Sequence, residues 1–267
     1  ERAVVGRFVG QANSAPEEVL GWLWYVIPPF LLSLITVLVY RPSLSYPFQF
    51  DDLANISKKF DIRFFDWKDH FFKYSRWVGE VLNRLNYKFG EYCRFGGGGF
   101  DTFYYRSFNV CMHILTGLVL CAVVYRLFSR LSDDLFLKKY AWPISLTTAG
   151  LFLLHPVQTQ TVLNVEHMRL EGLMVLMLLV TLYCFLRVLK DAHNDRLWYK
   201  NGWMYFALCF AVSAVGTKEA CIVLPLLAIA LDWFFIAAGS LSRLLSRVWA
   251  HVAFSTIFFV AFFSVNG

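Results

Sequence analysis

The chain has 267 residues, of which 58% are hydrophobic and only 16% are charged, and its mean hydropathy is +0.51. This composition excludes a soluble globular domain, because such a domain cannot bury so large a share of apolar side chains. The formal net charge is +6. Lys and Arg that flank apolar segments set membrane topology and bind anionic headgroups, so the positive charge does not require nucleic acid. We therefore expect an integral membrane protein that binds membrane lipids and no nucleic acid.

Apolar runs recur along the whole sequence, and a helix needs about 20 apolar residues to cross a bilayer. We predict seven transmembrane helices, at residues 22–40, 108–128, 142–155, 170–189, 203–216, 221–238 and 248–265. The third and fifth are short, which tilt or burial within the bundle can accommodate. The predicted fold is an all-α polytopic membrane protein, a single module over residues 1–267 that we interpret as a piece of a longer chain.

Lys and Arg set the expected orientation, because short cytoplasmic loops carry an excess of them. Among the short loops, the second, fourth and sixth hold most of the Lys and Arg residues: Arg126, Arg130, Lys138, Lys139, Arg187, Lys190, Arg196, Lys200, Arg243 and Arg247. We predict that these loops and the amino terminus are cytoplasmic. The first loop, residues 41–106, is long enough to be translocated whatever its charge, so it is expected on the extracytoplasmic or lumenal side.

Within the first loop, aromatic residues recur between charges at residues 60–74. This pattern predicts an interfacial amphipathic helix that lies along the membrane and covers the site described below. The same pattern also fits a helix that only packs on the bundle, and the sequence leaves both interpretations open.

The predicted topology gathers eight ionisable residues from distant parts of the sequence on one side of the membrane. They are Asp51, Asp52, Arg76, His155, Arg169, Glu171, Lys218 and Glu219. A charge beside hydrocarbon persists where it is paired, solvated or used, and the convergence of such groups is typical of a functional site. No recognisable ligand spacing accompanies the two aspartates, so we predict no metal.

Each of these residues also has a purely structural interpretation. One of the two aspartates suffices to cap a helix in the loop. His155 could be satisfied by backbone groups at a helix end, and Lys218 with Glu219 could form an interfacial ion pair. Amides beside spans usually bond between helices, and we expect this of Asn83, Asn86, Asn109 and His113.

Four segments carry a resemblance to a known family. In order, they are Phe-Gln-Phe-Asp-Asp (48–52); Tyr-Ser-Arg (74–76) with Leu-Asn-Arg-Leu-Asn-Tyr (82–87) and Phe-Asn-Val-Cys-Met-His (108–113); Leu-Leu-His-Pro-Val-Gln-Thr-Gln-Thr-Val (153–162) with Arg-Leu-Glu (169–171); and Gly-Thr-Lys-Glu (216–219) with Leu-Pro (224–225). Together they resemble the transmembrane and tetratricopeptide-repeat O-mannosyltransferases and their bacterial relatives, which are type C glycosyltransferases. The chain differs from the family pattern at Trp77, where proline is usual, and at Gln160, where an acidic residue is usual.

The resemblance implies a membrane glycosyltransferase with its site on the extracytoplasmic or lumenal side. Its donor would be a polyprenyl (dolichyl or undecaprenyl) phosphate sugar, with mannose as the family expectation, and its acceptor a Ser or Thr hydroxyl of a protein. Related enzymes whose donor carries a single phosphate generally work without a metal, so we expect no metal and no cofactor. A carboxylate suits removal of the hydroxyl proton, so Asp51 and Asp52 are the candidate catalytic bases, with a slight preference for Asp52.

Departure of a lipid phosphate develops negative charge, which cationic groups stabilise. The candidates for binding the donor phosphate are Arg169, Lys218, Arg76 and His155, with Glu171 and Glu219 in supporting roles. Two other function classes stay open. One is a transporter or flippase of a lipid-linked anion, which predicts broken helices in inverted repeats. The other is a noncatalytic membrane subunit of a larger assembly.

Overall fold

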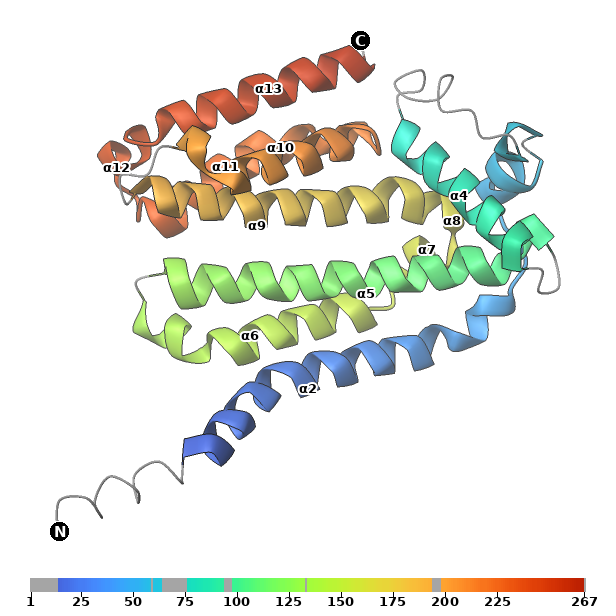
Figure 1. The fold of residues 1–267 in the computed structure, drawn as a ribbon, viewed down its shortest axis with the longest axis horizontal. Coiled ribbons are helices and arrows are strands. Elements are labelled where there is room, and N and C mark those ends of the chain that lie inside the picture. The colour runs from blue at the N-terminus through green and yellow to red at the C-terminus, as the bar shows by residue number, and fades with distance from the viewer. Residues whose placement is uncertain are drawn as a thin grey trace, which may run out of the picture.

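The computed structural model describes residues 14–58, 60–63, 76–93, 98–132, 134–193 and 198–266. Within these ranges the chain is helical in most places and contains no β-strand. Figure 1 shows long helices that run side by side, with short helices and loops gathered at the two ends. The prediction of an all-α polytopic membrane protein is confirmed.

Five helical stretches of the described residues are long and apolar enough to cross a membrane: Leu23–Ser45, Gly98–Leu131, Val165–Lys190, Glu219–Ile236 and Val248–Val265. Each overlaps one of the seven predicted spans. The other two predicted spans correspond to Leu135–Leu154 (α6) and to the shorter apolar helix Gly202–Val215 (α10).

The remaining main helices are α2 (Ser14–Tyr40), α4 (Trp77–Cys93), α5 (Thr102–Arg126), α9 (Leu173–His193), α11 (Leu224–Leu231) and α13 (Val248–Asn266). Three shorter helices are α7 (Gln158–Leu163), α8 (Val165–His167) and α12 (Leu241–Leu245). Single turns of tighter or wider helix are η1 (Arg41–Ser45), η2 (Leu53–Ser57), η3 (Phe60–Arg63), η4 (Gly98–Phe100), η5 (Leu127–Leu131), η6 (Met168–Gly172), η7 (Trp198–Lys200), η8 (Glu219–Val223) and η9 (Asp232–Ile236).

Helix α6 begins at Leu135, well before the predicted start at residue 142. The carboxylate of Asp134 caps this earlier start, because it accepts hydrogen bonds from the backbone N–H of Phe136 at 2.7 Å and of Leu137 at 3.1 Å. The exposed Lys138 and Lys139 follow and lower the local hydropathy. The short third span is therefore the apolar part of a longer, 20-residue helix.

The largest apolar core lies between α9, α10, α11 and α13. On α10, the fully buried residues Ala207, Ala211 and Ala214 recur every three or four positions and therefore share one helix face. Phe254 and Phe258 of α13 are also buried in this core. Small residues on one face let neighbouring helices approach closely, which is how helices associate within a membrane.

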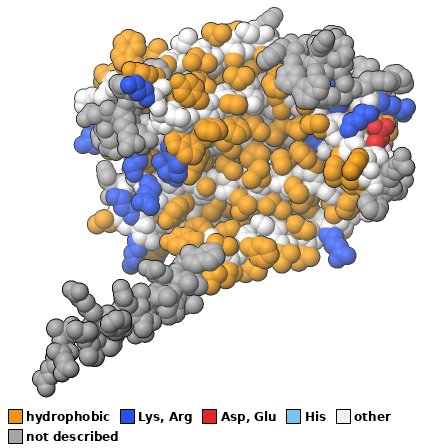
Figure 2. Space-filling view, viewed as in Figure 1, with side chains coloured by type: hydrophobic (Ala, Val, Ile, Leu, Met, Phe, Trp, Pro, Cys, Tyr) orange, Lys and Arg blue, Asp and Glu red, His pale blue; other side chains and the backbone are white. Residues whose placement is uncertain are grey.

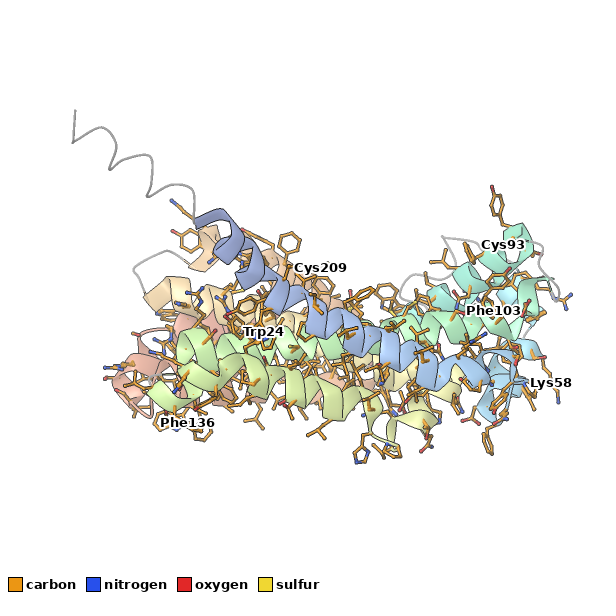
Figure 3. All side chains as sticks on the ribbon, turned by 90° about the horizontal axis from the view of Figure 1, so that it is seen from below. Trp24, Lys58, Cys93, Phe103, Phe136 and Cys209 are labelled. Atoms are coloured by element: carbon orange, nitrogen blue, oxygen red, sulfur yellow. The ribbon has the colours of Figure 1, made fainter. Side chains whose placement is uncertain are left out.

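The two ends of the bundle differ in what they hold. At one end lie α4, α7, α8 and the short helices η1 to η4; we call this the loop end (Figure 1). At the other lie η5, α12 and the start of α6; we call it the basic end. In Figure 3, Lys58 and Cys93 lie at the loop end and Phe136 lies at the basic end. Of the predicted amphipathic helix at 60–74, only Phe60–Arg63 falls within the described residues, so that prediction lies mostly outside them.

Candidate functional site

The two adjacent aspartates of the first loop have different surroundings. Asp52 is fully buried, whereas Asp51 is exposed and lines a cavity of about 540 Å³. The residue before them, Phe50, has a φ of 50°, in the left-handed region that residues with side chains rarely adopt. The backbone therefore turns sharply just before the pair. Strain of this kind is common at functional sites, where the surrounding structure maintains it.

Asp52 joins the first loop to the segment that follows α7. Its Oδ2 accepts a hydrogen bond from the backbone N–H of Val165 at 3.1 Å, and its Oδ1 accepts one from Glu166 at 2.9 Å. Burial raises the pKa of Asp52, while these two hydrogen bonds and the charge of Arg106 oppose that rise. Both carboxylate oxygens thus accept hydrogen bonds from the backbone, so Asp52 holds the first loop against the segment that follows α7.

Arg106 reinforces the same connection. This side chain is 1% exposed, and it donates from Nε to the carbonyl oxygen of Tyr46 at 3.1 Å and from Nη2 to that of Pro47 at 2.6 Å. Its Nη1 donates to the carbonyl oxygen of Leu163. A buried guanidinium is stable when its N–H groups are satisfied in this way. The first loop is therefore held to the end of α7 by a buried cation as well as by a buried carboxylate.

The cavity beside Asp51 lies between the first loop and α7. Its lining consists of Gln49, Phe50, Asp51, Thr159, Gln160, Leu163, Asn164 and His167. Its volume falls in the range of small-molecule sites. Amide, hydroxyl and imidazole groups donate and accept hydrogen bonds without a fixed charge, which suits a neutral polyhydroxyl ligand such as a sugar.

His167 connects this cavity to an ion pair. Its Nδ1 lies 3.6 Å from Oε2 of Glu171, and the other carboxylate oxygen of Glu171 accepts a hydrogen bond from Nζ of Lys218. The next residue, Glu219, pairs with Arg76 at 3.4 Å. The side chains of Lys218 and Arg76 are 30% and 46% exposed, so both cations are accessible to a ligand.

Arg169 lies inside the bundle instead. It is 1% exposed, and it donates from Nε to Oδ1 of Asn83 and from Nη1 to Oδ1 of Asn109, both at 3.2 Å. Its guanidinium lies 4.0 Å from the centroid of the Phe108 ring. These contacts join α4, α5 and η6, and they confirm that Asn83 and Asn109 bond between helices.

His155 and His113 each contact a backbone group. His155 is exposed at the end of α6, where its Nδ1 accepts a hydrogen bond from the backbone N–H of Val157 at 3.1 Å. His113 is buried, and its Nε2 lies 3.1 Å from the carbonyl oxygen of Leu153, which joins α5 to α6. His155 therefore has the contacts of a helix-end residue and does not line the cavity that Asp51 faces.

The elements that carry all eight predicted residues meet at the loop end, but their side chains form separate groups. Asp51 faces the cavity; Asp52 and Arg169 are buried in different hydrogen-bonding clusters; the other four charged residues form two ion pairs; and His155 stands apart. Sequence reasoning missed Arg106, although a cation beside an apolar run is a recognisable signal. It also missed His167 and Asn164, and it noted Gln160 only as a departure from the family pattern. The place of these three residues in the cavity depends on how α7 and α8 fold back.

Among the described ranges, no three or more His, Cys, Asp or Glu residues are grouped as a metal ion would require. Comparison with protein-family models, with curated proteins and with solved structures finds no match to this chain. Site geometry and the resemblance in the four segments are therefore what support a functional proposal.

Proposed function

We propose that the chain is a membrane glycosyltransferase that moves a monosaccharide from a polyprenyl phosphate to a hydroxyl acceptor, Ser or Thr of a protein. The observation that carries this proposal is the exposed carboxylate of Asp51 in a cavity of about 540 Å³ whose other polar side chains carry no fixed charge. Such a lining suits a sugar. The cavity lies at the end of membrane-spanning helices, which suits a donor whose lipid stays in the bilayer.

Asp51 is the proposed general base. As the acceptor hydroxyl oxygen attacks the anomeric carbon of the sugar, the hydroxyl proton passes to the Asp51 carboxylate. The bond from the anomeric carbon to the phosphate oxygen breaks, and the polyprenyl phosphate leaves with the electron pair. A positioned base contributes roughly 10²- to 10⁴-fold to such a reaction. Asp51 suits this role better than Asp52, because both oxygens of Asp52 accept backbone hydrogen bonds in a buried site.

Lys218 and Arg76 are the proposed partners of the donor phosphate. Each is partly exposed and is held by a carboxylate, Glu171 or Glu219, which a phosphate can replace with a similar charge-assisted hydrogen bond. Arg169 contributes by joining helices, since its guanidinium is buried and bonded to two asparagines. The contacts of His155 support a role in ending α6.

We place the loop end on the extracytoplasmic or lumenal side, with the amino terminus in the cytoplasm. The support for this orientation is the concentration of cations in the short connections of the basic end, because Lys and Arg are retained on the cytoplasmic side. These cations include Arg126, Arg130, Lys138, Lys139, Arg187, Lys190, Arg243 and Arg247.

The test is a transfer assay with the full chain in detergent, a short-chain polyprenyl phosphate mannose and a Ser/Thr-rich peptide. Wild type should form mannosyl peptide, and Asp51→Asn should lose most of its turnover while it retains donor binding. Asp134→Asn is the matched control, because Asp134 caps α6 at the basic end and asparagine also caps helices. It should keep full activity.

Two outcomes would contradict the proposal. In the first, Asp51→Asn transfers sugar as fast as wild type. In the second, wild-type chain reconstituted in vesicles moves the intact donor across the bilayer and transfers no sugar, which is the behaviour of a flippase.

A further inference from the structure

Phe50 combines an exposed aromatic ring with a strained backbone. Its side chain is 80% exposed and lines the same cavity of about 540 Å³ as Asp51. A single exposed apolar side chain is common on protein surfaces and by itself assigns nothing. The φ of 50° is different, because this left-handed conformation costs free energy for every residue with a Cβ and little for glycine. Glycine would form the turn more easily, so the phenylalanine points to a use for its ring.

Buried contacts on both sides of Phe50 maintain this conformation. Before it, the buried Arg106 binds the carbonyl oxygens of residues 46 and 47, and Phe48 packs against a buried apolar cluster. After it, the carboxylate of Asp52 accepts two backbone hydrogen bonds. In an ordinary extended segment, alternate residues point to the same side. The positive φ interrupts this alternation, and Phe50 lines the cavity while Phe48 and Asp52 pack inward.

Other exposed phenylalanines lie within the membrane-spanning stretches. Phe234 belongs to Glu219–Ile236 and Phe263 belongs to Val248–Val265, where lipid covers the outside of the helices. Figure 2 shows hydrophobic side chains across the flank of the bundle. Phe50 lies in the first loop, outside the five stretches found among the described residues, and most of its neighbours in the cavity are polar. A ligand in the cavity is therefore the partner that the geometry offers to this ring.

The face of a phenylalanine ring suits a sugar ring. An aromatic face is apolar and carries partial negative charge, whereas one face of a pyranose can present C–H groups that are weak donors. Stacking of the two removes apolar surface from water on both partners. The hydroxyl groups at the edge of the sugar need hydrogen-bonding partners, and the amides of Gln49 and Gln160 line the same cavity.

We propose that the ring of Phe50 stacks on the monosaccharide of the donor, a neutral pyranose, and holds its anomeric carbon close to Asp51. This inference rests on the transferase proposed above and assigns the residue that contacts the sugar. Phe50 and Asp51 are adjacent in the chain and line one cavity, so a sugar that lies on the ring stays near the carboxylate. The strained turn keeps both side chains on the cavity at once.

The experiment measures binding of two probes to the full chain in detergent. One probe is a short-chain polyprenyl phosphate mannose, and the other is the same polyprenyl phosphate without the sugar. Phe50→Leu keeps an apolar side chain and the backbone strain but removes the aromatic face. It should weaken binding of the mannose donor about tenfold and leave binding of the sugar-free lipid unchanged. Phe50→Trp keeps an aromatic face and should bind both probes as wild type does.

Two glycine variants test the strain separately from the ring. Ala238 has a φ of 49° in the turn between η9 and α12, so Ala238→Gly relieves a similar strain at the basic end. Phe50→Gly and Ala238→Gly should each raise the thermal unfolding midpoint by roughly 2 to 4 °C. Only Phe50→Gly should also weaken binding of the mannose donor, again about tenfold. A gain in stability with a loss of binding is the behaviour of strain that is kept for function.

The proposal is overturned if Phe50→Leu binds the mannose donor as wild type does. It is also overturned if Phe50→Leu weakens both probes equally, because the ring would then contact the lipid chain or the membrane instead of the sugar. A lower unfolding midpoint in Phe50→Gly would overturn it too, because the ring would then serve the fold.

Failure of this inference can be distinguished from failure of the transferase proposal. Wild type that forms mannosyl peptide, with Phe50→Leu binding the donor normally, overturns only the sugar contact. Wild type that forms no mannosyl peptide, but binds the donor tenfold more tightly than Phe50→Leu does, contradicts the transferase and supports the sugar contact.

Discussion

In the part of the chain that the structure describes, each end of the bundle holds one fully buried aspartate, and the two are satisfied in different ways. At the basic end, Asp232 accepts hydrogen bonds from Arg247, from Nε at 3.1 Å and from Nη2 at 2.6 Å, and lies 2.7 Å from Nε2 of His251. At the loop end, Asp52 accepts hydrogen bonds from two backbone amides, and the exposed Asp51 stands beside it on a cavity. A buried and fully bonded carboxylate indicates structure, whereas an exposed one on a cavity is available for chemistry.

The accessible charges of the two ends also differ. At the loop end, cations and carboxylates alternate in the pairs Lys218–Glu171 and Arg76–Glu219. At the basic end, the described residues that line a cavity of about 340 Å³ are Arg126, Arg130, Arg187, Lys190 and Trp203. The ion-paired cations of the loop end can exchange one anion for another during a reaction. This property is why we assign chemistry to the loop end.

The largest effect we expect separates the two adjacent aspartates of the loop end. Asp51→Asn should lower the transfer rate by roughly 10²- to 10⁴-fold and leave thermal unfolding unchanged. Asp52→Ala should instead destabilise the fold, because it leaves the buried N–H of Val165 without an acceptor at a cost of about 1–3 kcal/mol, and the partly buried N–H of Glu166 also loses its acceptor. Transfer assays and denaturant unfolding of both variants check this. Equal stability losses in the two variants would contradict the assigned difference.

The buried aspartate of the basic end should be the more sensitive structural residue. Asp232→Ala leaves the charge of Arg247 buried without its carboxylate, which should cost about 3–5 kcal/mol of unfolding free energy. Denaturant unfolding in detergent measures the loss. Asp134→Asn is the control, because Asp134 is exposed, caps α6 and can be replaced there by asparagine. A loss no larger than that of the control would show that the cluster contributes little.

The contact between α4 and the turn before η8 can be tested with matched glycines. A Cβ at Gly216 would lie 2.6 Å from Cε2 of Trp77 and 2.9 Å from Cγ2 of Val78, so Gly216→Ala should force these side chains apart. We expect a loss of about 1–3 kcal/mol in unfolding free energy. A Cβ at Gly202 would meet nothing within 4 Å, so Gly202→Ala should be nearly neutral. Equal effects of the two substitutions would argue against close packing at this contact.

The smallest effect we expect is the dependence of stability on pH. Burial raises the pKa of Asp52, but its hydrogen bonds and the charge of Arg106 offset part of that rise. Its pKa is raised above the ordinary 3.8, so folding favours the protonated form. The stability from this group is therefore fully present below the ordinary pKa and is lost as pH rises through the raised value. The unfolding midpoint of wild type minus that of Asp52→Asn should fall as the pH rises above the ordinary pKa of 3.8. A difference that rises with pH would contradict the shift.

Much of the fold could be predicted because membrane insertion depends on local composition. Runs of about 20 apolar residues form helices in lipid whatever their neighbours are, since each helix satisfies its own backbone hydrogen bonds. The early start of α6 had a local signal as well: Asp134 is a good helix cap that precedes the predicted span. Ordinary cap recognition would have corrected that boundary.

The sequence by itself determined the fold class, the order of the spans and the set of residues from which a site could form. Only the tertiary structure decided which aspartate faces the cavity, that Arg106 and Arg169 are buried, and that His167 lines the same cavity as Asp51. Adjacent residues are equivalent in any local pattern, and Asp52 becomes buried only because it meets the backbone of Val165, which is 113 positions away. Hydropathy is local and can be summed along a chain, whereas burial of a particular side chain depends on contacts between distant segments.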